Sequence, residues 1–145
     1  GLIKDEPGAD WNRVRAFAEI GLDQLELGRL DQATGSLERA RALFEKLQTR
    51  MHPAQAEVLV ALGRVNLARH DSAKALALLE EADAFWRDFD AGNRWAGETA
   101  LWLGRCYAAL GRDADAERAL GRAHSILSRS PIPGDSKLAR LARER

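Results

Sequence analysis

The chain has few of the residues that cross-link a fold or interrupt a helix. Its 145 residues contain one cysteine, Cys106, and four prolines. A single cysteine excludes an internal disulfide. Isoleucine, threonine and tyrosine are scarce, whereas alanine, leucine, arginine and glutamate dominate. This composition favours helix over strand and predicts an all-α domain.

The chain also lacks an excess of charge of either sign and a long apolar run. Lys+Arg and Asp+Glu number 22 each, so no net charge steers the protein toward nucleic acid or anionic lipid. The longest apolar run, VLVAL at 58–62, is far shorter than the ~20 residues of a membrane span. We therefore expect no nucleic-acid partner and no direct membrane insertion. The opening GLIKDEPGAD does not read as a signal peptide, and we expect it to be cut from a longer protein.

No combination of residues predicts catalysis. His52, His70 and His124 lie far apart at no metal-ligand spacing. Cys106 falls in a helix expected to be packed, which predicts a buried, inert thiol. No strand precedes a phosphate-binding loop, and no acid and base stand at a defined separation. The sequence thus predicts a protein that is not an enzyme and that holds no metal or cofactor.

A pattern of small residues occurs three times. The glycines Gly21, Gly63 and Gly104 are separated by 42 and 41 residues. Each is followed, at the same distances, by an alanine, a leucine and a second alanine: Ala33, Leu37 and Ala40; Ala75, Leu79 and Ala82; Ala116, Leu120 and Ala123. We expect each glycine to face the first alanine of its unit, so that two helices approach closely.

Each unit divides into two helices at a short polar break: GRLDQ at 28–32, RHDS at 69–72 and GRDAD at 111–115. Gly28 and Gly111 suit helix C-caps. The predicted N-caps of the second helices are Asp31, Asp71 or Ser72, and Asp113. Apolar residues at helical spacing predict helices over about 11–27, 32–48, 54–69, 73–88, 95–110, 114–129 and 136–144.

These units resemble tetratricopeptide repeats over residues 12–129. The resemblance rests on Leu62-Gly63 and on Leu103-Gly104 with Tyr107, together with the alanines and leucines of the second helices. The period is longer than the usual 34 residues and is similar to that of kinesin light chains. FWRDFDAGNRWAGETALWLGRCYAALGR also resembles the C-terminal repeat region of bacterial membrane-anchored Ser/Thr protein kinases. The resemblance implies a right-handed superhelical solenoid of three helix pairs.

The predicted organisation has three parts. Residues 1–10 form a flexible N-terminal segment, and three repeats occupy about 11–50, 52–92 and 93–130. A loop and a short helix at 131–145 follow, because SPIPGD at 130–135 ends the last repeat. The short helix, SKLARLARER, is predicted to cap the stack with Leu138, Leu141 and Ala142. The alternative, a basic helix on a membrane surface, is disfavoured by its narrow apolar stripe.

The resemblance implies that the first helix of each pair lines a concave surface, and helical spacing then gives its residues. The predicted positions are Arg15, Ala18, Leu22 and Leu25; Glu57, Val60, Arg64 and Leu67; and Glu98, Leu101, Trp102, Arg105 and Ala108. As partner-binding residues we single out Arg15, Leu22, Glu57, Arg64, Glu98, Trp102 and Arg105.

Two features of this surface have alternative interpretations. Arg64 and Arg105 occupy the same place in successive units and can form a fork for a carboxylate or phosphate; otherwise each pairs with a glutamate such as Glu57 or Glu98. Trp86 and Trp95 either form an aromatic clasp between the second and third repeats or include an exposed anchor. Trp102 is the best candidate for a partner anchor.

The function predicted is a protein–protein interaction module, the docking or sensory domain of a larger bacterial signalling protein, that binds a protein or peptide on its concave face. The alternative is a structural scaffold that self-associates through its end faces, with a homo-oligomer as the result. The compartment is left open: cytoplasmic, or periplasmic for part of a membrane-anchored kinase.

Overall fold

The computed structural model describes residues 9–47, 51–132 and 134–144, which form seven helices and no strand. The helices are α1 (Ala9–Glu26), α2 (Leu30–Leu47), α3 (Pro53–Ala68), α4 (Ser72–Asp90), α5 (Arg94–Ala109), α6 (Asp113–Leu127) and α7 (Asp135–Leu141). Every predicted helix is present, with its ends within three residues of the expected ones. Of the segment predicted to be flexible, residues 1–8 lie outside the described part, and residues 9 and 10 begin α1.

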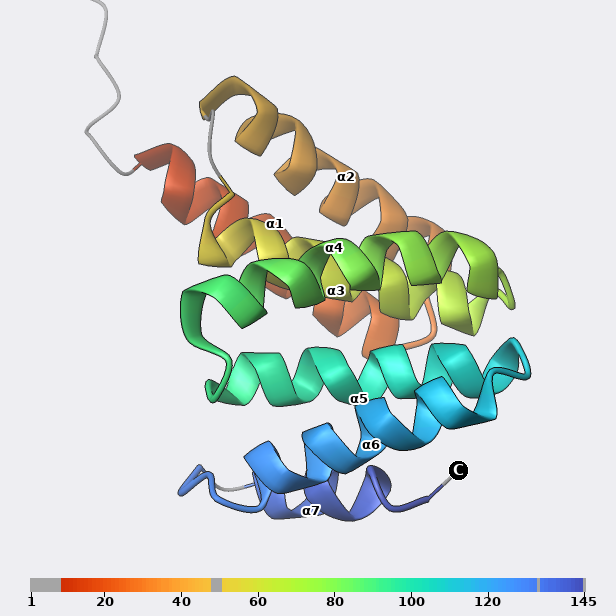
Figure 1. The fold of residues 1–145 in the computed structure, drawn as a ribbon. Helices are drawn as coiled ribbons and strands as arrows, with labels where there is room; N and C mark the ends of the chain where they lie inside the picture. The colour runs from red at the N-terminus through yellow and green to blue at the C-terminus, as the bar shows by residue number, and fades with distance from the viewer. Residues whose placement is uncertain (1–8, 48–50, 133, 145) are drawn as a thin grey trace, which may run out of the picture.

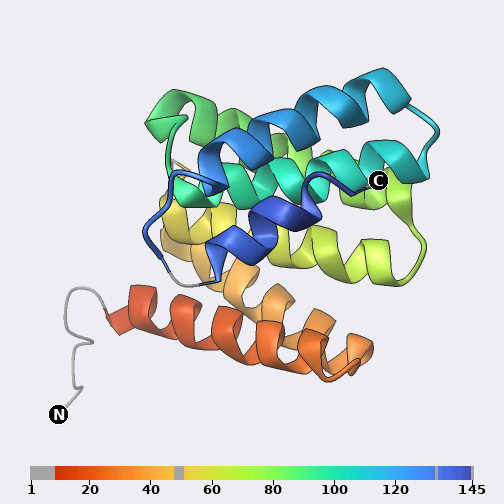
Figure 2. The same cartoon turned by 90° about the horizontal axis from the view of Figure 1, so that it is seen from below.

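The helices form three antiparallel pairs that stack in chain order. The pairs are α1 with α2, α3 with α4, and α5 with α6, and neighbouring pairs pack against each other (Figure 1). The short α7 packs against α6 and α5 at the C-terminal end of the stack (Figure 2). The predicted all-α solenoid of three helix pairs and a terminal helix is therefore confirmed.

The three turns within pairs share one helix-ending motif. Gly28 and Gly111 have positive φ angles of 73° and 74°, and His70 takes the equivalent place with φ 64°. In each turn the next residue's N–H donates to a carbonyl five residues back, at 2.8 Å: Arg29 to Gln24, Asp71 to Asn66 and Arg112 to Tyr107. This is the Schellman arrangement, and in the second unit a histidine adopts the left-handed conformation that glycine adopts elsewhere.

The starts of the helices follow the predicted caps only in part. Asp71 is the N-cap of α4, with its carboxylate accepting from the Lys74 N–H at 3.2 Å. Asp31 and Asp113 instead lie inside the first turns of α2 and α6. There their charge still favours the positive end of the helix dipole.

The repeated glycines face leucines. The expectation that they face the alanines was wrong for Gly63 and Gly104, whereas a Cβ at Gly21 would also lie 3.4 Å from the Ala33 carbonyl. A Cβ added at Gly63 would lie 2.7 Å from the Leu79 Cγ, and the same contact recurs between Gly21 and Leu37 and between Gly104 and Leu120. In an antiparallel pair, residues equally far from the turn lie opposite each other. A glycine near the middle of the first helix therefore meets the leucine 16 residues later, and not the alanine close to the turn.

The core runs through the stack as two clusters of buried side chains. The larger reaches from Val14 in α1 to Cys106 in α5 and includes the fully buried Phe44 and Trp86. The smaller joins α5, α6 and α7 around Leu101. No helix in the described residues is both long enough and apolar enough to span a bilayer.

The terminal helix is fixed by an ion pair that the sequence did not predict. The Asp135 carboxylate, 1% exposed, accepts two hydrogen bonds from Arg94, one from Nε at 2.9 Å and one from a terminal nitrogen at 2.8 Å. Ser130 donates a further bond, at 2.5 Å. Because the hydrogen bonds from Arg94 stabilise the ionised form most, the pKa of Asp135 lies below its ordinary value. The start of α7 is thereby held to the start of α5.

Candidate functional site

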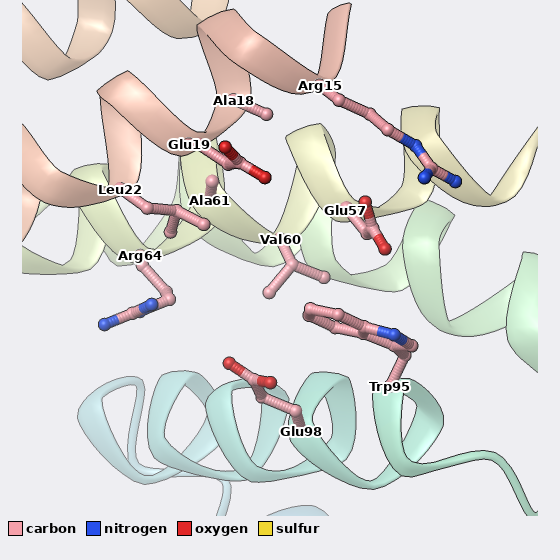
Figure 3. Close-up of a pocket in the computed structure, with 10 residues that line it drawn as sticks. All are labelled: Arg15, Ala18, Glu19, Leu22, Glu57, Val60, Ala61, Arg64, Trp95 and Glu98. Carbon is pink, nitrogen blue, oxygen red and sulfur yellow. The ribbon is translucent and has the colours of Figure 1, made fainter. Parts of the chain in front are cut away.

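The first helices of the three pairs enclose two adjoining hollows. The glutamate hollow, of about 410 Å³, is lined by Arg15, Ala18, Glu19, Leu22, Glu57, Val60, Ala61, Arg64, Trp95 and Glu98 (Figure 3). The tryptophan hollow, of about 370 Å³, is lined by Leu25, Glu26, Arg64, Leu67, Ala68, Trp102 and Arg105. Arg64 belongs to both, so the two hollows follow one surface from α1 across α3 to α5.

The structure brings together most of the residues proposed for the concave surface. All seven partner-binding candidates line one of the two hollows: Arg15, Leu22, Glu57 and Glu98 the first, Trp102 and Arg105 the second, and Arg64 both. Leu101 was misplaced, because it is fully buried with the residues of α6 and α7. Ala108 lines neither hollow.

Sequence reasoning missed five lining residues: Glu19, Glu26, Ala61, Ala68 and Trp95. Glu26 and Ala68 stand four residues after Leu22 and Arg64, so the same helical spacing could have found them. Trp95 lies at the first turn of α5, where the sequence alone gives no indication of the direction of its side chain.

In the glutamate hollow, burial raises the pKa of two carboxyl groups. Desolvation is the largest cause for both Glu57 and Glu98, because charge is less favourable away from water. The charge of Arg15 acts against the shift at Glu57, and the charges of Arg64 and Arg94 act against it at Glu98. Carboxylates and guanidiniums thus line this hollow together with the apolar Leu22 and Val60 (Figure 3).

In the tryptophan hollow, two guanidiniums lie over one indole. The guanidinium carbon of Arg64 is 4.5 Å from the ring centroid of Trp102, and that of Arg105 is 5.8 Å from it. Both distances are within the range of cation–π attraction. The indole therefore holds the two arginines of successive repeats side by side in a single hollow.

The ion pairing of these arginines differs from the pairing with Glu57 or Glu98 that the sequence raised as one alternative. Arg64 donates to Glu26 at 2.8 Å, across to α1, and not to Glu57 or Glu98. Arg105 makes no ion pair with a carboxylate of the described residues. The Nε atoms of both arginines are buried and have no acceptor. Buried donors without acceptors are energetically unfavourable, and Arg105 also carries its charge without a carboxylate partner, so this hollow is suited to a ligand with an anionic group.

The aromatic clasp expected between Trp86 and Trp95 does not form. Trp86 packs edge-on against Phe85 and Phe89, with ring centroids 5.0 and 5.9 Å away. Trp95 turns away into the glutamate hollow (Figure 3), where Arg94 lies 4.7 Å from its ring. Trp86 is therefore part of the core, whereas Trp95 lines the hollow.

The other side chains that could react chemically, Cys106 and His52, have structural roles. Cys106 is buried and donates to the Ser72 carbonyl at 3.1 Å, and burial raises its pKa to about 11, so it stays a thiol at neutral pH. His52 caps α3 by accepting from the Ala54 N–H and stacks on Trp11 at 4.0 Å. In the described residues, no three His, Cys, Asp or Glu side chains group as ligands for a metal.

The stacked helix pairs and their shared hollows define a helical-repeat protein of the kind that binds other proteins. The family comparison is specific: residues 12–88 match the tetratricopeptide repeat model. That match covers more than half of the chain, and the protein belongs to the tetratricopeptide repeat family.

A solved structure gives the same fold. The chain is similar to PcrH, seen in a crystal structure in complex with the chaperone binding region of PopB, with a TM-score of 0.66 at 17% sequence identity. The likeness covers 99% of this chain and 96% of that chain. A search of curated proteins finds no match to the sequence.

Proposed function

We propose that this protein is a non-catalytic docking module that holds a segment of a partner protein in the two hollows of its concave face. The observation that carries the proposal is the tryptophan hollow, where two buried Nε donors lack acceptors beside a half-buried indole. PcrH, which shares the fold, is seen in complex with a region of another protein. The tetratricopeptide family and this neighbour both support a protein or peptide ligand.

The chemistry of the hollow specifies part of the ligand. A carboxylate of the bound segment accepts from Arg105, which has no carboxylate of its own, and from the open donors of Arg64. An apolar side chain next to it packs on Trp102, Leu25 and Leu67. Tryptophan and arginine dominate binding energy at many protein interfaces, so Trp102 and Arg105 are expected to contribute most.

The cellular role follows as the second step of the proposal. A binding module without catalytic groups is suited to dock or sense partners within a larger signalling protein, and the resemblance of 85–112 to bacterial Ser/Thr kinase repeat regions favours this context. We propose no nucleic-acid ligand, because cations and anions are balanced in the chain.

Site-specific photo-crosslinking tests the proposal. A benzoylphenylalanine at Leu67, inside the tryptophan hollow, is expected to trap a partner from extracts of the source cells. The same probe at the exposed Ala73 of α4 is the matched control. Trapping at both positions, or at Ala73 alone, would place the interface elsewhere.

A variant series then identifies the residues involved. Trp102→Ala and Arg105→Ala are each expected to weaken the trapped partner's binding at least about tenfold, with the helical circular dichroism unchanged. Exposed Lys74→Ala is the control. If only the chain itself is trapped, and its mass in light scattering rises with concentration, the self-associating scaffold replaces the docking module.

A further inference from the structure

A third hollow lies apart from the concave face and is rich in arginine. We call it the arginine hollow; it has a volume of about 400 Å³. Leu103 and Tyr107 of α5 contribute to it, with Arg87 from α4 and Arg118 and Arg122 from α6. This hollow is lined by α4, α5 and α6, which pack together in the stack (Figure 1), whereas the tryptophan hollow is lined by α1, α3 and α5. It shares no lining residue with the other two hollows.

One buried carboxylate holds two of these guanidiniums. Asp83 is 7% exposed, and its two oxygens bind different arginines. Oδ1 accepts from Arg122 of the next repeat at 2.9 Å, and Oδ2 lies 3.0 Å from the Nε of Arg87. The two guanidiniums are therefore fixed from two helices by a single negative charge.

A second carboxylate repeats the arrangement on α6. Asp115 accepts from Arg112 through Oδ2, at 2.8 and 2.9 Å, and from Arg118 through Oδ1. Four guanidiniums thus share two carboxylates, and Glu80 binds the hydroxyl of the lining Tyr107, so cations outnumber anions by one around this hollow. Each guanidinium has five N–H donors and uses only one or two of them here. The side chains of Arg87 and Arg118 are 61% and 73% exposed, so their remaining donors are accessible to a ligand.

The ligand that suits three lining guanidiniums with unused donors is an anion with several acceptor oxygens. A phosphate monoester carries a charge of about −1.5 to −2 at neutral pH and three acceptor oxygens, whereas a carboxylate carries only one charge. Guanidiniums form paired, parallel hydrogen bonds with such oxygens. The geometry points to a binding site for the phosphorylated serine or threonine of a partner segment, held between Arg87 and Arg122 on one side and Arg118 on the other.

The apolar wall favours an ester over the free ion. Leu103 and Ala119 line the same hollow, and the ring of Tyr107 faces it from α5. The Tyr107 hydroxyl donates to Glu80 at 3.2 Å, and the guanidinium carbon of Arg112 lies over the ring, 4.6 Å from its centroid, so only the remaining ring surface can contact the ligand's carbon atoms. Inorganic phosphate has no such carbon atoms and therefore gains no binding free energy from contact with this apolar wall.

Nuclear magnetic resonance on the intact chain tests the site. The arginine Nε–H signals are followed while N-acetyl-O-phosphoserine amide is added at constant ionic strength. The signals of Arg87, Arg118 and Arg122 are expected to shift together, while that of the exposed Arg140 on α7 stays in place. Inorganic phosphate and N-acetylglutamate amide serve as comparison probes. Phosphoserine is expected to bind at least about tenfold more tightly than glutamate, since an extra charged hydrogen bond changes affinity by about that factor.

Two substitutions distinguish paired hydrogen bonding by a guanidinium from attraction by charge alone. Arg118→Gln, at an exposed position, is expected to weaken phosphoserine binding about tenfold, and Arg118→Lys, which keeps the charge but loses the fork, several-fold. Arg140→Gln is the control with the same charge change. Equal binding of glutamate and phosphoserine would overturn the proposal, as would equal losses in Arg118→Gln and Arg140→Gln. Inorganic phosphate that binds as tightly as the ester would reduce the site to an ion site and overturn the assignment to a phosphorylated residue.

Discussion

Gly63 of α3 faces α4, and Leu79 occupies the space that a side chain at this position would need. A Cβ at this position would be 2.7 Å from the Leu79 Cγ, a distance that real contacts do not reach. Leu79 is fully buried, so it has no free space to move into. The glycine is therefore a packing requirement, although glycine inside a helix is unfavourable by about 1 kcal/mol relative to alanine.

Two glycine substitutions test this distinction. Gly63→Ala is expected to lower the free energy of unfolding by about 1–3 kcal/mol, because overpacking outweighs the gain in helix propensity. Gly121→Ala, in α6 with nothing within 4 Å of the added Cβ, is expected to raise it by about 0.5–1 kcal/mol. Urea denaturation measures both. An increase in the free energy of unfolding for both variants would show that propensity alone decides at both positions.

His70 has a backbone conformation that its side chain disfavours. Its φ of 64° matches those of Gly28 and Gly111 at the equivalent turns. The left-handed region is unfavourable by roughly 1 kcal/mol for a residue with a Cβ. His70→Gly is therefore expected to raise the thermal midpoint by a few degrees, whereas His70→Ala is expected to leave it unchanged or lower it. A lower midpoint for the glycine variant would mean that the imidazole makes a stabilising contact.

Glu98 makes the stability of the stack depend on pH. Its folded pKa lies above the ordinary 4.5, mainly through burial, so the folded state binds more protons than the unfolded state as the pH rises through this range. The free energy of unfolding then falls from pH 4.5 upward. Glu98→Gln is expected to be more stable than the wild type at pH 7 and equally stable below pH 4.5. A difference that persists unchanged at low pH would exclude titration of Glu98 as its origin.

At the scale of the element, α7 shows which structural features helical spacing can predict and which it cannot. The apolar Leu138, Leu141 and Ala142 indicated a short helix packed on the last pair, and the structure contains it. The pairing of Asp135 with Arg94 joins residues 41 positions apart and follows no local pattern. Such contacts depend on how the helices pack in three dimensions, so the sequence predicted the helix but not the ion pair that fixes it.

Removing this ion pair is expected to release α7. Asp135→Ala leaves Arg94 without its buried carboxylate, a loss of about 3 kcal/mol, which corresponds to about a 100-fold larger open population of α7. Limited trypsin digestion at Lys137 and Arg140 is expected to accelerate by the same factor. Asp113→Ala, which also removes an acidic residue from a first helical turn, is the control. An unchanged cleavage rate would show that apolar packing alone holds α7.

At the scale of the whole molecule, the repeat spacing predicted the architecture and most of the candidate site. Counting from the aligned glycines placed Arg64 and Arg105 at corresponding positions, and the structure sets both over Trp102. The same counting misplaced Leu101, because α6 and α7 cover that side of α5. It also gave the wrong ion-pair partners for Arg64, Glu57 or Glu98, since Glu26 reaches Arg64 only after α1 and α3 stack. Helical periodicity thus predicts which face of its helix a residue occupies, whereas the packing of neighbouring repeats determines which residues it contacts there.

A stack of repeats is stabilised by contacts between neighbours, so its middle is expected to be its most stable part. The helix α3 packs against α1, α2, α4 and α5, and nine of its residues are buried. By contrast, α7 packs against α5 and α6 only. Amide exchange opens first where few contacts must break. We therefore expect the slowest exchange in α3, faster exchange in α1 and the fastest in α7, as measured by mass spectrometry of peptides after deuterium labelling. Equal rates in α3 and α7 would mean that the chain opens only as a whole, and that the two core clusters unfold as one unit.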